Sequence, residues 1–369
     1  MKVAIIGTVG IPANYGGFET LVEQLVRHNH SEELQYSIYC SSKSYIDERW
    51  VYHGARIEYI NLKANGIQSI PYDVISLIRA SRKSDVVLVL GVSGCVFLPI
   101  FRLFSKRRLI INIDGLEHRR DKWNKWIRKL LKYSEKQAVK YADVIVTDNK
   151  GITDYVAEEY HRDSKLIAYG GDHVLSDIPM KSQIEILSRY GLMPDSYFLA
   201  ICRIEPENNV HLILDSFANR GDLNLVFIGN WKKNEYGRLL HKDYHGRKNI
   251  VLLDAIYDIE RLYAIRNNCT AYIHGHSAGG TNPSLVEAMF FGKPIIAYEC
   301  VYNRETTENK AIYFDSSEDL KSKLTSISQN DGNKMKEIAL RRYTWNHIAT
   351  EYEKLYTCCS SHIKEILDT

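Results

Sequence analysis

The segment from Ile273 to Met289 combines a short β-prone stretch, paired glycines and a proline. Glycines permit backbone conformations and close approaches that a Cβ would block, and Pro283 suits the first turn of a helix expected at Ser284 to Phe291. The free N–H groups and the dipole at a helix N-terminus bind anions, so a diphosphate would fit there. Glu287, one turn into this helix, would point at the group that the phosphate carries. A plain strand-to-helix turn with a solvated glutamate is the alternative interpretation.

A second glycine-rich loop, Gly7 to Glu19, directly follows the first expected strand. It lacks the Gly-x-Gly-x-x-Gly spacing, and the acidic residue about 20 positions further on, that a dinucleotide-binding loop requires. Paired glycines at a helix start can instead wrap backbone around a sugar or a phosphate. The residues expected to form this ligand loop are Gly10, Asn14, Tyr15, Gly16, Gly17 and Glu19. A flexible loop capped by glycine is the alternative.

Carboxylates follow the expected buried strand at Leu109 to Ile113. Side chains at the carboxyl end of a parallel strand are well placed for acid–base catalysis or for orienting a hydroxyl group. We therefore assign Asp114, Glu117 and His118 as candidate catalytic residues, with the two carboxylates ahead of the histidine. Asp-Gly is also a common turn pair, which is the competing explanation.

Three successive strand ends in the second half of the chain offer a cation, a glycine and an aromatic side chain. Arg203 follows one buried strand, where an arginine can neutralise a diphosphate. Gly229 and Asn230 follow the next strand, with Lys232 nearby, and Tyr257 follows the third, where it can flank a base. Together with the glycine-rich loop between Ile273 and Met289, these residues predict a nucleotide-diphosphate pocket.

The elements that must position these residues alternate between strands and helices, as parallel sheets require. The fold expected is therefore α/β, with two Rossmann-like, doubly wound parallel-sheet domains that face a central cleft. The strands expected are Val3–Ile6, Ser37–Cys40, Ile57–Ile60, Val86–Leu90, Leu109–Ile113, Val144–Thr147, Leu166–Ala168, Tyr197–Ile201, Leu225–Ile228, Ile250–Leu253, Ala271–His274, Pro294–Ala297 and Ile312–Phe314.

The same pattern divides the 369 residues, about twice the length of a typical domain. We expect a first domain at 1–171, a linker at 172–194 and a second domain at 195–343. The last segment, 344–369, is expected to form a helix that packs back towards the first domain.

Charge is unevenly distributed, although the net charge is only +3. Residues 1–171 contain 25 Lys and Arg against 19 Asp and Glu, and the stretch 119–140 alone contains nine Lys and Arg against two acids. Apolar residues recur there at helical spacing, namely Trp123, Trp126, Ile127, Leu130 and Leu131. A basic helix with an aromatic stripe is typical of binding to an anionic membrane surface. A core-facing stripe with solvated charges is the alternative.

Composition excludes several classes of protein. The apolar uncharged run Val86 to Phe101 is shorter than the roughly 20 residues that cross a bilayer, and no signal peptide is expected. Seven scattered cysteines without a Cys-x-x-Cys pair indicate reduced thiols in a cytoplasmic protein and argue against zinc. The basic helix carries no nucleic-acid-reading motif, and the second half is acidic, so no nucleic-acid partner is expected.

The motifs together resemble family 4 of the retaining glycosyltransferases, which have the GT-B architecture. The resemblance lies in Gly16-Gly17-x-Glu19, in Arg203-x-x-x-Glu207, and in Pro283-Ser-Leu-x-Glu-Ala-Met-x-x-Gly-x-Pro-Ile. More narrowly, these blocks, together with the Asp114-Gly-Leu-Glu segment, resemble the bacterial rhamnosyltransferase-like branch that builds capsule and cell-wall polysaccharides.

The resemblance implies that the second domain binds the donor, with Glu287 on the ribose or on the sugar hydroxyls. Two departures alter that site: Gly279 stands where the family has a glutamate, and Asn208 stands where it has a lysine. Arg203 and the amides of 279–284 would then hold the phosphates, while His274 or His276 fills the vacant space. The donor-binding residues expected are Arg203, Asn208, Gly229, Asn230, Lys232, Tyr257, His274, Gly279, Gly280, Thr281, Asn282, Ser284, Leu285 and Glu287.

The function that the resemblance implies is transfer of a sugar, with L-rhamnose from dTDP-L-rhamnose as the first expectation. The acceptor would be a saccharide on polyprenyl diphosphate, reached from the inner face of the cytoplasmic membrane. Neither a metal nor another cofactor is expected, and the chain has no Asp-x-Asp pair of the kind that holds a divalent ion in the other major glycosyltransferase architecture. The alternatives are a galactofuranosyl-, galactosyl- or glucosyltransferase that uses a UDP-sugar, a sugar-nucleotide epimerase or hydrolase, and a non-catalytic carbohydrate-binding protein.

Overall fold

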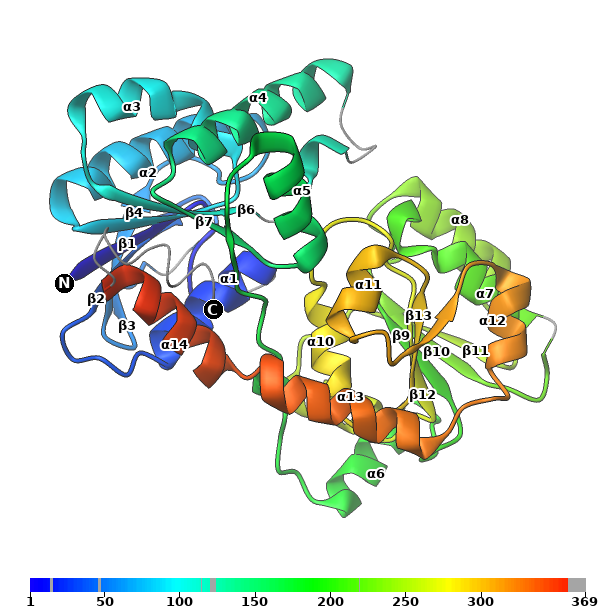
Figure 1. The fold of residues 1–369 in the computed structure, drawn as a ribbon. Helices are drawn as coiled ribbons and strands as arrows, with labels where there is room; N and C mark the ends of the chain where they lie inside the picture. Colours follow the sequence, from blue (N-terminus) through cyan, green and yellow to red (C-terminus); the bar gives the residue numbers. More distant parts are fainter. Residues whose placement is uncertain (14–15, 46–47, 114, 120–123, 219, 358–369) are drawn as a thin grey trace. The chain divides into compact units, whose positions relative to one another are not determined.

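The computed structural model describes residues 1–13, 16–45, 48–113, 115–119, 124–218 and 220–357. The chain forms two compact units. The first comprises Met1–Tyr169 and the segment that begins at Trp345, and the second comprises Gly170–Thr344. Each unit contains one sheet with helices on both faces (Figure 1).

The sheet of the first unit has eight strands within the described residues, in the order β3-β4-β2-β1-β5-β6-β7-β8. Neighbouring strands are parallel except for β3 and β4. The bounds are β1 Lys2–Ile6, β2 Gln35–Ser41, β3 Val51–Tyr52, β4 Ala55–Ile60, β5 Val86–Leu90, β6 Arg108–Ile113, β7 Val144–Thr147 and β8 Lys165–Leu166. Strand order reverses between β1 and β5, so the loops after these two strands lie at a topological switch point.

Strand β3 is the one strand of the described chain that the sequence pattern missed, and it makes this sheet mixed. It pairs antiparallel with β4 across a two-residue turn at His53 and Gly54, whose φ angles are 45° and 80°. Two successive positive φ angles match the twist of a tight hairpin. A strand of two residues is too short to produce a recognisable alternation of apolar and polar side chains.

Helices cover both faces of the first sheet (Figure 1). On one face lie α1 (Gly17–Arg27) and α14 (Trp345–Thr357), which pack against each other. On the other face lie α2 (Ser69–Lys83), α3 (Leu98–Phe104), α4 (Lys125–Tyr141) and α5 (Lys150–Tyr160). Among all the helices that the structure describes, none combines the length and apolarity needed to span a bilayer.

Helix α14 is a structural part of the first unit. Its buried face, including Trp345 and Ile348, lies in the same apolar cluster as α1 and β1. The buried Asn112 of β6 donates a hydrogen bond from Nδ2 to the Tyr352 hydroxyl at 2.7 Å. The amide of His30 donates to Glu353 at 3.0 Å. The C-terminal helix therefore completes a core that begins at the N-terminus.

The second unit contains a six-stranded parallel sheet, in the order β11-β10-β9-β12-β13-β14 as far as its described residues show. Its strands are β9 Phe198–Ile201, β10 Leu225–Gly229, β11 Ile250–Asp254, β12 Ala271–His274, β13 Ile295–Tyr298 and β14 Ile312–Phe314. Its helices are α6 Met180–Arg189, α7 Val210–Ala218, α8 Glu235–Tyr244, α9 Ile259–Asn267, α10 Pro283–Met289, α11 Val301–Thr306, α12 Ser317–Lys323 and α13 Gln329–Arg342. Strand order reverses between β9 and β12, which brings the loops after these strands together.

Residues 172–194, which we expected to be a linker, belong to the second unit and contain α6. Leu187 of α6 is fully buried. Gln183 accepts hydrogen bonds from the side-chain amides of Asn267 and Asn268, both at 2.9 Å. The segment was predicted as a linker because its composition is polar, but one face of α6 is apolar and packs on α9.

Replacing Tyr352 by Phe is expected to destabilise the first unit. The change leaves the buried Nδ2 of Asn112 without its acceptor, and an unsatisfied buried donor costs about 1–3 kcal/mol. The measurement is thermal unfolding, in which each kcal/mol corresponds to a decrease of about 2–4 °C in Tm for a unit of this size. Asn346→Ala, at an exposed position of the same helix, is the control and should leave Tm unchanged. Equal Tm values for the Tyr352 variant and the wild type would contradict the expectation.

Candidate active site

The β12–loop–α10 segment has the strand, loop and helix that the sequence predicted. The Asn282 side chain caps α10, since its Oδ1 accepts hydrogen bonds from the backbone N–H of Ser284 at 3.0 Å and from its hydroxyl at 2.8 Å. Pro283 occupies the first turn. Gly279 has a φ of 78°, in the left-handed region that glycine tolerates and that a glutamate would adopt only with strain. Glycine at position 279, where the resemblance implies a glutamate, therefore suits the local backbone conformation.

The loop after β12 packs tightly against the loop after β9. A Cβ on Gly275 would lie 2.2 Å from the carbonyl oxygen of Asn208, so only glycine fits there without a shift of the backbone. The Asn209 side chain donates to the Gly275 carbonyl at 2.9 Å. Both the amide and the hydroxyl of Ser277 donate to the Glu207 carbonyl, each at 2.9 Å. These contacts join two loops that are almost 70 residues apart in sequence.

Asn208 is 3% exposed and uses both polar ends of its side chain inside the protein. Its Nδ2 donates to the Arg203 carbonyl at 2.7 Å, and its Oδ1 lies 2.7 Å from Nδ1 of His276. We expected this position to contact the donor directly, in place of the family lysine. The side chain instead links the Arg203 loop to the loop after β12.

The Arg203 loop is also held from the side of β10. Asn230 accepts a hydrogen bond from the Ile204 amide at 2.8 Å, and Asn234 donates to the Ile204 carbonyl at 2.7 Å. A Cβ on Gly229 would lie 2.3 Å from the Ile204 side chain. Gly229 and Asn230, both expected to bind the donor, thus support the loop that carries Arg203.

Arg203 itself is partly buried, and its guanidinium makes no hydrogen bond or ion pair with any residue that the structure describes. A cation fixed at the carboxyl end of a central strand, without a carboxylate partner, is suited to binding an anion. Two other expected residues lie further out in solvent. Lys232 pairs with Asp254 at 3.1 Å, and both are strongly exposed, while Tyr257 is 64% exposed.

Glu287 is held by two basic side chains that the sequence did not single out. Its Oε2 pairs with the guanidinium of the buried Arg266 of α9, and its Oε1 lies 3.6 Å from Nε2 of His173. Arg266 Nε has no partner among the described residues. Arg266 belongs to no sequence motif. Its contact with Glu287 arises only because the fold places α9 next to α10.

His274, at the end of β12, is buried, and its Nε2 has no hydrogen-bond partner in the described part of the chain. Burial, together with the neighbouring His276, holds the pKa of His274 well below its usual value, so the ring is neutral. A buried ring nitrogen without a partner is uncommon and marks a place where a ligand group could bind.

The loop after β1 is hydrogen-bonded to the carboxylate of Glu19, at the start of α1. Oε1 of Glu19 accepts hydrogen bonds from the Thr8 hydroxyl at 3.0 Å and from the Val9 amide at 2.8 Å. A Cβ on Gly16 would lie 1.9 Å from the other oxygen of Glu19. This carboxylate therefore fixes the loop after β1. Of the other residues expected in this ligand loop, Asn14 and Tyr15 lie outside the described residues.

Asp114, the first candidate catalytic residue, also lies outside the described residues. Glu117 and His118 lie in a 3-10 turn, η3 (Glu117–Arg119). Nδ1 of His118 is 2.9 Å from Oε2 of Glu135, a buried residue of α4. In the sequence, Glu135 is one of only two acids in a basic stretch, and its position opposite Trp126 on the helix is the one local sign that it faces the core. Across the described residues, no group of three or more His, Cys, Asp or Glu has the arrangement of a metal site.

Comparisons with known families cover most of the chain in two parts. Residues 185–343 match the family described as Glycosyl transferases group 1, and residues 1–172 match the family described as Domain of unknown function (DUF1972). No curated protein matches the sequence significantly.

Solved structures match both units together. Sucrose-phosphate synthase from Thermosynechococcus elongatus has a TM-score of 0.79 at 15% identity, over 96% of this chain and 98% of its own. Anabaena HepE in complex with UDP has a TM-score of 0.76 at 14% identity, over 97% and 100% of the two chains. A glycosyltransferase from Rickettsia africae has a TM-score of 0.72 at 12% identity, over 100% and 98%. At these identities the likeness shows the fold, which is GT-B.

The architecture and the matched domain define the class of this protein. It is an enzyme with the GT-B fold. Its second unit contains the glycosyltransferase group 1 domain, and the chain is a glycosyltransferase.

Gly275→Ala is expected to lower the stability of the second unit. The added methyl group would meet a backbone oxygen at 2.2 Å and force the two loops apart, and overpacking of this kind costs about 1–3 kcal/mol. Gly221→Ala is the matched control, since a Cβ there has nothing within 4 Å and the backbone needs no positive φ. Thermal unfolding of both variants gives the comparison. If Gly275→Ala unfolds at the same temperature as Gly221→Ala, the close approach is not a real constraint.

Proposed function

We propose that the enzyme transfers a sugar from a nucleoside-diphosphate donor, bound by the second unit, to a saccharide acceptor bound by the first. The observation that carries this proposal is Arg203, a cation without a carboxylate partner among the described residues, whose loop backbone is held at the carboxyl end of β9 by Asn208, Asn230 and Asn234. An arginine on a loop fixed in this way is suited to neutralising a diphosphate.

The leaving nucleoside diphosphate gains negative charge as the bond to the sugar breaks. Arg203 and the loop amides at 279–284 would stabilise that charge, an electrostatic effect typically worth about 3–4 kcal/mol for one donor. Glu287, held by Arg266, would accept hydrogen bonds from hydroxyls of the ribose or the sugar. Neither role requires a metal ion. Glu117, His118 and Asp114 remain the residues proposed to orient the acceptor hydroxyl.

The donor that we propose first is dTDP-L-rhamnose, transferred with retention of configuration. This choice is based on the motifs that resemble the rhamnosyltransferase-like branch. The alternative is a UDP-sugar, because HepE, one of the structurally similar proteins, was solved with UDP-glucose. Direct competition between dTDP and UDP for the purified protein separates the two.

Arg203→Ala is expected to weaken binding of the donor diphosphate at least ~10-fold, or about 1.4 kcal/mol, because the charge-assisted contact is lost. Ligand binding raises Tm by mass action, so thermal shifts with UDP and with dTDP measure the effect. Arg220→Ala is the control: this arginine precedes β10, at the amino-terminal end of the strands, and pairs with Asp222 at 2.8 Å. A nucleotide-induced shift in Arg203→Ala equal to that of Arg220→Ala would remove the assignment.

We further propose that the acceptor is lipid-linked and that the enzyme works at the inner face of the cytoplasmic membrane. The support is a surface on α3 and α4, which pack side by side (Figure 1). Leu103 of α3 is 85% exposed, and Trp126 of α4 is 80% exposed. The exposed apolar side chains of this surface, the α3–α4 face, are Ile100, Leu103, Phe104, Trp126, Leu130 and Tyr133.

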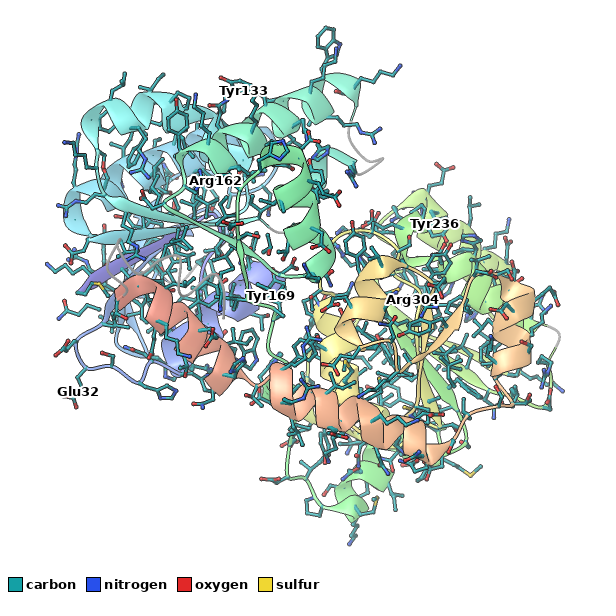
Figure 2. All side chains as sticks on the ribbon, in the orientation of Figure 1. Glu32, Tyr133, Arg162, Tyr169, Tyr236 and Arg304 are labelled. Atoms are coloured by element: carbon teal, nitrogen blue, oxygen red, sulfur yellow. The ribbon has the colours of Figure 1, made fainter. Side chains whose placement is uncertain are left out.

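Helical spacing places these residues on the outer side of each helix. Positions 100, 103 and 104 share one face of α3, and positions 126, 130 and 133 share one face of α4. Figure 2 shows Tyr133 on the side of α4 that points away from the sheet. The sequence pattern had grouped Trp126 and Leu130 with Ile127 and Leu131, but only the latter two are partly buried. The stripe is therefore divided between the core and the solvent.

The charge of this region fits an anionic lipid surface. Residues 98–141 contain thirteen Lys and Arg against four Asp and Glu, whereas the whole chain has a net charge of only +3. Among the described residues of this stretch, the exposed basic ones are Lys106, Arg107, Arg119, Lys125, Lys129, Lys136 and Lys140. Apolar side chains that insert and lysines that bind lipid phosphates are the two contributions that hold an interfacial helix on a membrane.

Replacing Leu103 and Phe104 together by Ser is expected to reduce binding to anionic vesicles at least ~10-fold, because two inserted side chains are lost. The assay is co-sedimentation with phosphatidylcholine vesicles, with and without phosphatidylglycerol. Wild-type protein should bind only the anionic vesicles, and less at high salt. Leu239→Ser, at an exposed apolar position of α8, is the control and should bind like the wild type. Undiminished binding of the double variant would contradict the proposal.

A further inference from the structure

Glu135 is a buried carboxylate of the first unit that no motif identified. Its side chain is 2% exposed, and it projects from α4 towards η3 and α5. Oε1 accepts hydrogen bonds from the hydroxyls of Tyr155 at 2.7 Å and Tyr160 at 2.6 Å. Oε2 lies 2.9 Å from Nδ1 of His118. Both oxygens are therefore used, and one of them contacts a candidate catalytic residue.

The protonation of this cluster follows from its hydrogen bonds. Burial raises the pKa of Glu135, but hydrogen bonds from His118, Tyr160 and Tyr155 outweigh it and bring the pKa below its usual value. Glu135 is then ionised at neutral pH and can only accept hydrogen bonds. Nδ1 of His118 must therefore carry the proton of this contact. In the neutral ring, Nε2 is left as an acceptor.

The backbone around His118 is fixed by the same helix. Nε of Arg128 donates to the His118 carbonyl at 2.9 Å, and Nη2 donates to the Arg119 carbonyl at 2.9 Å. The Arg119 guanidinium lies 4.7 Å from the centre of the Tyr155 ring. Arg162 holds the C-terminal end of α4 (Figure 2). Its guanidinium donates to the Val139 carbonyl at 3.1 Å and to the Ala142 carbonyl at 3.2 Å.

A carboxylate that orients a histidine through Nδ1 is the arrangement by which many enzymes hold the other ring nitrogen ready for a substrate. Nε2 of His118 has no hydrogen bond to any residue that the structure describes. We propose that Glu135 is a positioning residue that fixes His118 as the Nδ1–H tautomer, so that Nε2 accepts a hydrogen bond from a hydroxyl of the sugar acceptor. The identity of the hydroxyl rests on the proposed function, whereas the tautomer does not.

The tautomer can be measured directly on the full-length protein labelled with 15N-histidine. Long-range 15N–1H correlation spectra at pH 7.5 should show Nδ1 of His118 protonated and Nε2 unprotonated. Glu135→Met has a similar size but accepts no such hydrogen bond, so His118 should move towards the Nε2–H form. Tyr160→Phe is the matched control: it removes one hydrogen bond from the same carboxylate but keeps the acceptor for Nδ1, so the tautomer should persist.

The kinetic test uses the same variants with a sugar donor and a saccharide acceptor. We expect kcat to fall at least ~10-fold in Glu135→Met, with the KM for donor little changed and Tyr160→Phe close to wild type. An Nε2–H tautomer in the wild-type protein overturns the proposal even if Glu135→Met fails to fold. So does an unaltered kcat in a folded Glu135→Met. Absence of transfer by wild-type protein, with the Nδ1–H tautomer present, would instead count against the proposed function and leave the positioning role standing.

Discussion

The candidate active site of the second unit depends on the close approach of two backbone loops, those after β9 and β12. Gly275 lies against the carbonyl of Asn208, and the side chains of Asn209 and Ser277 bridge the two loops. This approach sets the distance between Arg203 on one loop and the start of α10 on the other. A side chain at Gly275 would change that distance, and a shift of about 1 Å in a catalytic group can cost two orders of magnitude in rate. The parallel sheet brings the loops together, and the absent Cβ fixes their final spacing.

Two positions differ from the family that the motifs resemble. At position 208, where that family has a lysine, this chain has an asparagine whose short side chain stays buried and joins Arg203 to His276. At position 279 the backbone has a positive φ, which favours glycine over glutamate. Compared with that family pattern, one cation and one carboxylate are absent together, so the net charge is the same. Glu287 keeps its carboxylate, and the buried Arg266 compensates it.

Helix α4 carries two different sets of side chains on opposite faces. One face carries Arg128 and Glu135, which hold the backbone and the ring of His118. The opposite face carries exposed apolar and basic side chains of the α3–α4 face. In the arrangement that we propose, this helix lies between a lipid surface and His118, and it would place a lipid-linked saccharide at a fixed depth relative to His118. Such an arrangement needs only one element, because side chains half a helical turn apart point in opposite directions.

The sequence by itself determined every described strand except β3, the GT-B architecture and the segments that carry the candidate site, because apolar periodicity and glycine-rich loops are local signals. It placed β12, its loop and α10 correctly, and it proposed Arg203 and Glu287 as donor-binding residues. The tertiary structure alone showed that Asn208 points inward, that Arg266 holds Glu287, that Glu135 holds His118, and that α14 shares the core of β1. These pairings depend on which helix packs beside which strand. The local sequence around a side chain does not reveal a partner that lies 17 to 240 residues away.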